Sequence, residues 1–161
     1  IGVGTATWDY AWMGIFAATI LWIIGVVAGD PGVASKVSVL NPVLWLVGAA
    51  VHTAGWQFVE ACELVNPFFE KTVRIQRERG HRVIDTGPYH YVRHPGYVGF
   101  ALVLLSLPVV LDFMPVWIPS LAAIAALVGR TAMEDRLLRA ELAGYEAYAE
   151  RTRYRLLPGV W

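Results

Sequence analysis

Cysteine is nearly absent from this 161-residue chain, because Cys62 is the only one. A single thiol excludes an internal disulfide and any metal site made of several cysteines, and no other metal site is predicted. The chain also contains no Gly-x-Gly-x-x-Gly sequence and no Walker sequence, so a Rossmann or P-loop nucleotide site is not indicated. Nothing in it resembles a nucleic-acid reader, and nucleic acid is not an expected partner.

Charged residues are missing from long stretches of the chain. Hydrophobic residues make up 57% of it and seven residues are Trp, which is more than a soluble domain needs. Tyr10–Gly29 carries no charge and, at about 1.5 Å per residue, is long enough to cross a hydrocarbon core of about 30 Å. Val37–Val59, Pro95–Leu111 and Phe113–Gly129 are further apolar runs. We therefore expect an all-α integral membrane bundle of about four transmembrane helices.

Basic residues are distributed very unevenly. Twelve of the thirteen Lys and Arg, all except Lys36, lie in residues 71–93 or 130–155. Cytoplasmic loops of membrane proteins carry an excess of Lys and Arg. This pattern predicts that both termini and the 66–94 loop face the cytoplasm, with turns at 30–38 and 112–115 on the other side. We expect a multi-pass protein of the cell inner membrane whose active site faces the cytoplasm.

The second apolar run carries polar groups that are unusual in a membrane span. His52, Trp56 and Glu60 follow one another at intervals of four and Glu63 comes three residues later, so a helix would align them on one face. An ionisable group that faces lipid costs on the order of 3 kcal/mol, which favours a bundle interior or a cavity. His52, Trp56 and Glu60 are therefore candidate substrate-binding residues. A position of Glu60 and Glu63 in headgroup water is an equally good interpretation.

Side chains suited to chemistry gather in residues 87–99, which read Gly-Pro-Tyr-His-Tyr-Val-Arg-His-Pro-Gly-Tyr-Val-Gly. Pro88 and Pro95 each disfavour a helical conformation at the preceding residue, which predicts an extended, stiff loop. The alternation of such a segment would point Arg93 and His94 in opposite directions. A helix is expected to begin near Pro95. On composition alone, the segment is also typical of the aromatic belt of a membrane protein.

The last apolar run is expected to continue as a helix past Arg130 into water. Glu134 would then lie at the same membrane face as His94, where the third helix begins. Met133–Glu150 is rich in helix formers and predicts a C-terminal helix with a weak point at Gly144. The tail over residues 144–158 could close a pocket from below, but by itself it is more typical of an amphipathic helix on the headgroups.

Three sequences together resemble the isoprenylcysteine carboxyl methyltransferase family and its phospholipid methyltransferase relatives. They are the 87–99 segment, Glu134-Asp135-x-x-Leu138 and the Gly144-Tyr145-x-x-Tyr148 tail. The resemblance divides the chain into N-terminal transmembrane helices, residues 1–65, and a membrane-embedded methyltransferase core, residues 66–161. The family has a second glutamate where this chain has Asp135, which keeps the charge on a shorter side chain.

The resemblance implies an enzyme that transfers a methyl group from S-adenosylmethionine to the carboxylate, amine or thiol of a lipophilic or lipidated acceptor, with membrane lipids as its surroundings. It implies that Arg93 and Glu134 are catalytic and that Arg93 orients the acceptor. The implied cofactor-binding residues are Tyr89, His94, Pro95, Tyr97, Gly99 and Glu134. A binding site for this cofactor needs a carboxylate, an Arg or a helix amino terminus, an apolar slot and aromatic faces. This part of the chain can supply each of them.

Two other interpretations stay open. A membrane reductase of the sterol type has a similar carboxy-terminal motif and binds NADPH at a related site, but about four spans leave little protein to enclose a sterol. The other is a catalytically inactive membrane scaffold, which the joint occurrence of the three sequences disfavours. The basic run at residues 77–81 is more typical of a solvated, lipid-facing patch, and a lid over the site is the alternative.

Overall fold

The computed structural model describes residues 5–30 and 42–161, and within these residues the protein is all-helical and contains no strand. The long helices are α1 (Thr7–Ala28), α3 (Pro42–Val65), α4 (Pro95–Val110) and α5 (Trp117–Glu141). The expected turn at 30–38 lies outside the described residues except for its first position. The all-helical prediction is confirmed.

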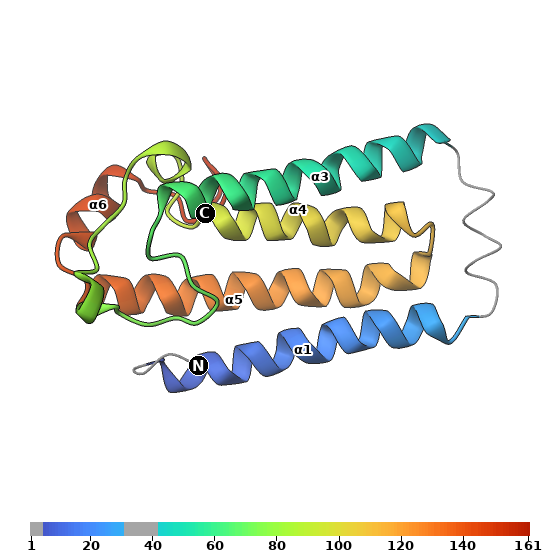
Figure 1. Ribbon diagram of the computed structural model, residues 1–161, viewed down its shortest axis with the longest axis horizontal. Helices are drawn as coiled ribbons and strands as arrows, with labels where there is room; N and C mark the ends of the chain where they lie inside the picture. Colours follow the sequence, from blue (N-terminus) through green and yellow to red (C-terminus); the bar gives the residue numbers. More distant parts are fainter. Residues whose placement is uncertain (1–4, 31–41) are drawn as a thin grey trace.

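The long helices lie side by side in the order α3, α4, α5, α1, and each packs on its neighbour in this row (Figure 1). At one end, α4 and α5 are joined by a short turn that contains Asp112, at a φ of 45°, and the 3-10 helix η3 (Met114–Val116). At the other end lie the 66–94 loop, the short helix α6 (Tyr145–Arg151) and the C-terminal tail. The chemistry-bearing segments therefore gather at one end of an apolar bundle.

The contact between α3 and α4 depends on two glycines. A Cβ atom on Gly55 would lie 2.9 Å from the carbonyl oxygen of Gly99, and one on Gly99 would lie 2.8 Å from the carbonyl oxygen of Gly55. Both distances are too short for a real Cβ, so only glycine lets the two backbones approach this closely. Small residues at helix contacts are typical of membrane proteins.

Much of the bundle's outer surface is apolar. Leu21 of α1 and Leu46 of α3, for example, are exposed over 67% and 60% of their surface. Two of the described helices are long and apolar enough to cross a membrane, namely Thr7–Ala28 and Met114–Glu141, and Pro95–Val110 is apolar but shorter. The first of them begins earlier than the uncharged run at Tyr10 and so includes Asp9.

The prediction of an extended segment before α4 is wrong. Residues Gly87–His90 form the 3-10 helix η2, and Tyr91 has helical backbone angles. Gly87 adopts a φ of 57°, and Pro88 occupies an early position in the turn, where its fixed φ and missing N–H are tolerated. The predicted start of the next helix at Pro95 is confirmed.

The C-terminal part is helical up to the predicted weak point. The helix that passes Arg130 ends at Glu141, and α6 begins at Tyr145 after Gly144 with a φ of 82°. A continuous helix over Met133–Glu150 is therefore wrong, because the left-handed glycine reverses the chain. This reversal packs α6 back against α5, where buried Leu142, Tyr145 and Tyr148 form a small core.

Candidate functional site

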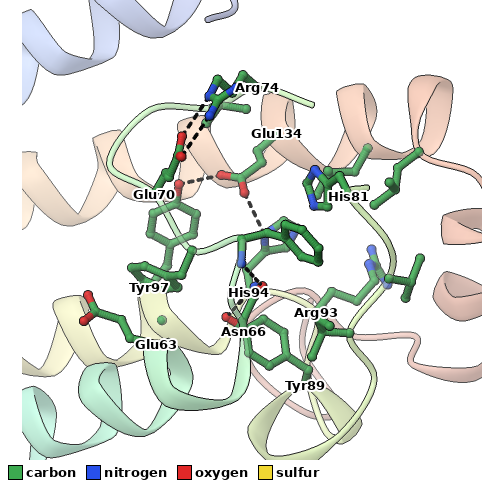
Figure 2. A pocket seen from close by; sticks show the side chains of 18 of the residues that line it. Glu63, Asn66, Glu70, Arg74, His81, Tyr89, Arg93, His94, Tyr97 and Glu134 are labelled. Atoms are coloured by element: carbon green, nitrogen blue, oxygen red, sulfur yellow. Dashed lines mark hydrogen bonds and ion pairs between the residues drawn. The ribbon is translucent and has the colours of Figure 1, made fainter. Parts of the chain in front are cut away.

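A cavity of about 770 Å³ lies at this end of the bundle. Its walls come from α3, α4, α5 and α6 and from the 66–94 loop, and Figure 2 shows His94, Tyr97 and Glu134 turned toward one another. Its lining includes the polar, charged and aromatic residues Trp56, Glu63, Lys71, Arg82, Tyr89, Arg93, His94, Tyr97, Arg130 and Glu134. The volume is in the range of about 300–1,000 Å³ that small-molecule sites have.

The loop over the cavity is fixed by its own polar contacts. The buried Gln76 donates from Nε2 to the carbonyl oxygen of Phe68 at 2.7 Å. Arg74 donates from Nε to Glu70 at 2.8 Å and is also paired with Glu78. His81 stacks on the Phe68 ring at 4.5 Å. These contacts fix the conformation of residues 66–86, where the 3-10 helix Arg77–Arg79 is the one regular element before η2.

Glu134 is held at the cavity by Tyr97 and His94. The Tyr97 hydroxyl donates to Oε2 of Glu134 at 2.5 Å, and Nδ1 of His94 lies 3.9 Å from Oε1 (Figure 2). The rings of His94 and Tyr97 are stacked, with centroids 6.0 Å apart. The Glu134 side chain keeps 22% of its surface exposed, so its carboxylate has acceptor capacity left for a ligand.

Asp135 is the electrostatic centre behind this wall, with a side chain that is fully buried. Its Oδ1 accepts from Nε of Arg93 at 2.7 Å and from the Tyr145 hydroxyl at 3.1 Å. Its Oδ2 accepts from Nε of Arg155 at 2.9 Å and from Nε of Arg139 at 3.3 Å. A single carboxylate on α5 thus joins the end of the 66–94 loop, α6 and the C-terminal tail.

Tyr145 keeps its proton in this cluster. Burial raises the pKa of the Tyr145 phenol well above its ordinary value, so the hydroxyl remains a donor to Asp135. Nε2 of His94 lies 3.3 Å from this hydroxyl and 3.3 Å from Oδ1 of Asp135. The Nε2 side of His94 therefore faces the buried acid, and its Nδ1 side faces Glu134.

Arg93 and His94 do not point in opposite directions as expected, since both contact Oδ1 of Asp135. The reason is that His94 is the residue at which the chain turns into α4, so strand-like alternation does not apply. Arg93 also donates from Nη2 to Asp135 at 3.1 Å and from Nη1 to the carbonyl oxygens of Thr152 and Arg153 at 2.8 and 2.7 Å. Four of its five N–H groups are thus already bonded within the protein.

The other expected cofactor residues divide into two groups. Tyr89 and Tyr97 line the cavity, as His94 and Glu134 do. The Tyr89 hydroxyl accepts from Nδ2 of Asn66 at 3.1 Å, and burial raises the pKa of this phenol. Pro95 and Gly99 are buried but do not line the cavity, because Pro95 starts α4 and Gly99 faces α3.

The expected substrate residues on α3 are separated by the structure. Nδ1 of His52 lies 2.8 Å from Oγ of Ser106, and its Nε2 accepts from Nε1 of Trp56 at 3.2 Å. His52 therefore bridges α3 and α4 with both ring nitrogens engaged. Trp56 and Glu63 line the cavity, whereas His52 does not and Glu60 is exposed outside its lining.

Sequence reasoning missed two positions that shape the cavity. One is Gly96, where a Cβ atom would lie 2.5 Å from Cε2 of Phe69, so that only glycine leaves room for this ring. The other is the ion pair of Asp9 with Arg130, whose side chains are 0% and 10% exposed. Asp9 and Arg130 are each a lone charge next to a long apolar run. That shared feature was a signal in the sequence for an ion pair between the first and last long helices.

The described residues form a helical scaffold with a polar cavity at the end of an apolar bundle. Residues 46–140 match the model of the isoprenylcysteine carboxyl methyltransferase (ICMT) family. The match covers more than half of the chain, so the protein belongs to this family and is by class a membrane methyltransferase. No match was found among curated proteins or solved structures.

Proposed function

We propose that the protein is an integral membrane methyltransferase that uses S-adenosylmethionine to methylate a carboxylate, amine or thiol on a lipophilic acceptor. The observation that carries the proposal is the Glu134 carboxylate, which Tyr97 holds in the wall of a 770 Å³ cavity between a polar loop and an apolar bundle. Membership of the family supports the same reaction class.

The residues around the cavity fit this cofactor, which supplies a methyl group on a sulfonium ion. Glu134 offers a partly exposed carboxylate to the cofactor's cationic groups. Tyr89 and Tyr97 offer aromatic faces to the sulfonium and to the adenine ring. Lys71 and Arg82 line the cavity and are exposed, so they are the cations we assign to the cofactor's carboxylate.

The chemistry asked of the protein is mainly alignment and exclusion of water. An acceptor carboxylate is already ionised at neutral pH, whereas an amine or thiol must lose a proton. His94 suits that role, because Asp135 lies at its Nε2 and Glu134 at its Nδ1. Arg93 acts on the acceptor only indirectly in this scheme, by holding Asp135 and the C-terminal tail.

The apolar part of the acceptor would lie toward α3 and α4. Trp56 packs edge-to-face on Phe100 at 5.8 Å, and both rings line the cavity. Trp56 is 49% exposed on the outer surface of the bundle. This pair thus connects the cavity wall with the surface that we assign to lipid, and we expect acceptor specificity to be set there.

We further propose that α1, α3, α4 and α5 all cross the cell inner membrane, with both termini and the 66–94 loop in the cytoplasm. The bundle's apolar outer surface and the clustering of basic residues at the cavity end support this arrangement. A cysteine placed at Arg77 in a Cys62→Ser background should react with a membrane-impermeant reagent only in inverted vesicles. Labelling only from outside intact cells would contradict the arrangement.

Calorimetry of the detergent-solubilised protein tests the cofactor directly. We expect binding of S-adenosylmethionine and none of NADPH, followed by transfer of labelled methyl groups to a lipid fraction. Glu134→Gln should weaken cofactor binding by roughly 1–3 kcal/mol, the contribution of a hydrogen bond to a charged group. Glu141→Gln, an exposed acid on the same helix outside the cavity lining, is the matched control. Equal affinities for S-adenosylmethionine in both variants and the wild type would refute the assignment of Glu134 as a cofactor-binding residue.

A further inference from the structure

Arg130 of α5 has two acids within reach. Glu134 lies four residues further along the same helix, a spacing at which Arg and Glu side chains are neighbours and attract each other. The structure instead pairs Arg130 with Asp9 of α1, from Nε to Oδ1 at 2.8 Å and from Nη2 to Oδ2 at 3.2 Å. Among residues 5–30 and 42–161, Asp9 is the only acid in an ion pair with Arg130.

Asp9 is itself fixed by the loop that covers the cavity. Its Oδ2 accepts from the backbone N–H of Val73 at 2.8 Å, and the Val73 carbonyl oxygen accepts from the N–H of Ala6 at 3.0 Å. Nη2 of Arg130 also donates to the carbonyl oxygen of Lys71 at 2.5 Å. The first turn of α1 thus holds both the cavity loop and the Arg130 side chain.

Arg130 and Glu134 lie on either side of the same tyrosine. The guanidinium carbon of Arg130 is 5.7 Å from the centroid of the Tyr97 ring, and the Tyr97 hydroxyl donates to Glu134. All three residues line the cavity. Without Asp9, a largely buried guanidinium would have Glu134 as its nearest available carboxylate on α5, and a carboxylate paired in this way attracts a cationic ligand less strongly.

We propose that Asp9 is a positioning residue that sequesters Arg130 and so leaves the Glu134 carboxylate available to the cationic part of the methyl donor. The proposal deepens the proposed function and rests on it. Asp9 lies outside residues 46–140, the region matched by the family model. The first helix, which carries none of the family's sequence signature, thereby acquires a role in setting the charge of the site.

Three forms of the full chain in lipid nanodiscs test the proposal by calorimetry with S-adenosylmethionine. Asp9→Asn, which keeps an oxygen acceptor for the Val73 N–H, should weaken binding about tenfold, or about 1.4 kcal/mol. The double variant Asp9→Asn with Arg130→Gln should regain most of that affinity, because no guanidinium is left to compete for Glu134. Asp85→Asn, which breaks the exposed pair with Arg151, is the control for the loss of an ion pair in itself.

Two results would overturn the proposal. Wild-type affinity in Asp9→Asn would show that Glu134 is available without Asp9. A double variant that binds as weakly as Asp9→Asn, or more weakly, would show either that the ion pair only fastens α1 or that Arg130 contacts the cofactor itself.

A thermal-unfolding cycle tests the same competition without any ligand. If Arg130 pairs with Glu134 once Asp9 is neutralised, Glu134→Gln should lower the unfolding midpoint more in the Asp9→Asn background than in the wild type. Equal decreases in both backgrounds would refute the sequestration of Arg130, whether or not the cofactor binds. Failure of the wild type to bind S-adenosylmethionine would refute the proposed function, and the cycle would still decide on Arg130.

Discussion

Arg93→Lys should destabilise the protein even though it keeps the positive charge. The Arg93 side chain is 2% exposed and makes four hydrogen bonds, two to Asp135 and two to carbonyl oxygens of the C-terminal tail. A lysine has three donors on a single atom and cannot reproduce the two parallel bonds to a carboxylate. At about 1.5 kcal/mol for each bond to a charged group, the loss of two bonds amounts to about 3 kcal/mol.

The predicted loss can be measured by thermal unfolding in detergent. For a chain of this size, about 3 kcal/mol corresponds to a decrease of the midpoint of roughly 6–12 °C. We also expect the tail to be cleaved faster by trypsin at Arg151 and Arg153, because Arg93 bonds to the backbone on both sides of the bond between residues 152 and 153. Arg136→Lys, an exposed position on α5, is the matched control and should change neither quantity.

The same variant separates a structural role of Arg93 from direct orientation of the acceptor. If Arg93 acts through Asp135 and the tail, Arg93→Lys should weaken cofactor binding and slow turnover together. A midpoint within about 2 °C of the wild type, with turnover lost and cofactor affinity kept, would refute this reasoning and restore the acceptor-orienting role.

Two further changes probe the cavity walls. Gly96→Ala should weaken S-adenosylmethionine binding about tenfold in calorimetry, because the new methyl group would displace the Phe69 ring. Phe69→Leu in the same chain should restore part of the affinity. Wild-type affinity in Gly96→Ala would contradict the close approach of Gly96 and Phe69. Burial lowers the pKa of His81, whose Nδ1 accepts from the N–H of Gln76 at 3.2 Å. The neutral form is therefore favoured by folding, so trypsin sensitivity of the loop should rise as the pH falls below about 6.5, and a His81→Gln variant should lose this pH dependence.

The sequence was sufficient to predict the long helices and the end of the bundle at which the cavity lies. Long uncharged runs and proline positions carry that information locally, so the start of α4 at Pro95 could be predicted, whereas Gly144 was expected only as a weak point of a continuous helix. The prediction of an extended conformation before α4 was wrong, because Pro88 and the left-handed Gly87 together also suit a 3-10 turn. Short-range rules do not decide between these two conformations.

The partners of the buried charges could not be predicted, since they depend on which helices become neighbours. Asp135 was known from sequence only as a shortened version of the family's second acid. Its contacts with Arg93, Arg139 and Arg155 come from three separate elements. The roles assigned to Tyr89, His94 and Glu134 as cofactor residues stay predictions, although the structure brings all three to one cavity.

Charged side chains of both signs line the cavity. Arg93 is paired with Asp135, Arg130 with Asp9, and Arg74 with Glu70 and Glu78, so three of the arginines that line the cavity are neutralised by acids that hold structure. Glu134 and Glu63 line the same cavity, and neither forms an ion pair with an arginine or a lysine in the part of the chain that the structure describes. Lys71 and Arg82 also line the cavity and are exposed, and neither forms an ion pair with an acid among those same residues. Acids and cations are therefore both available at the cavity, as a ligand with a sulfonium, an ammonium and a carboxylate requires.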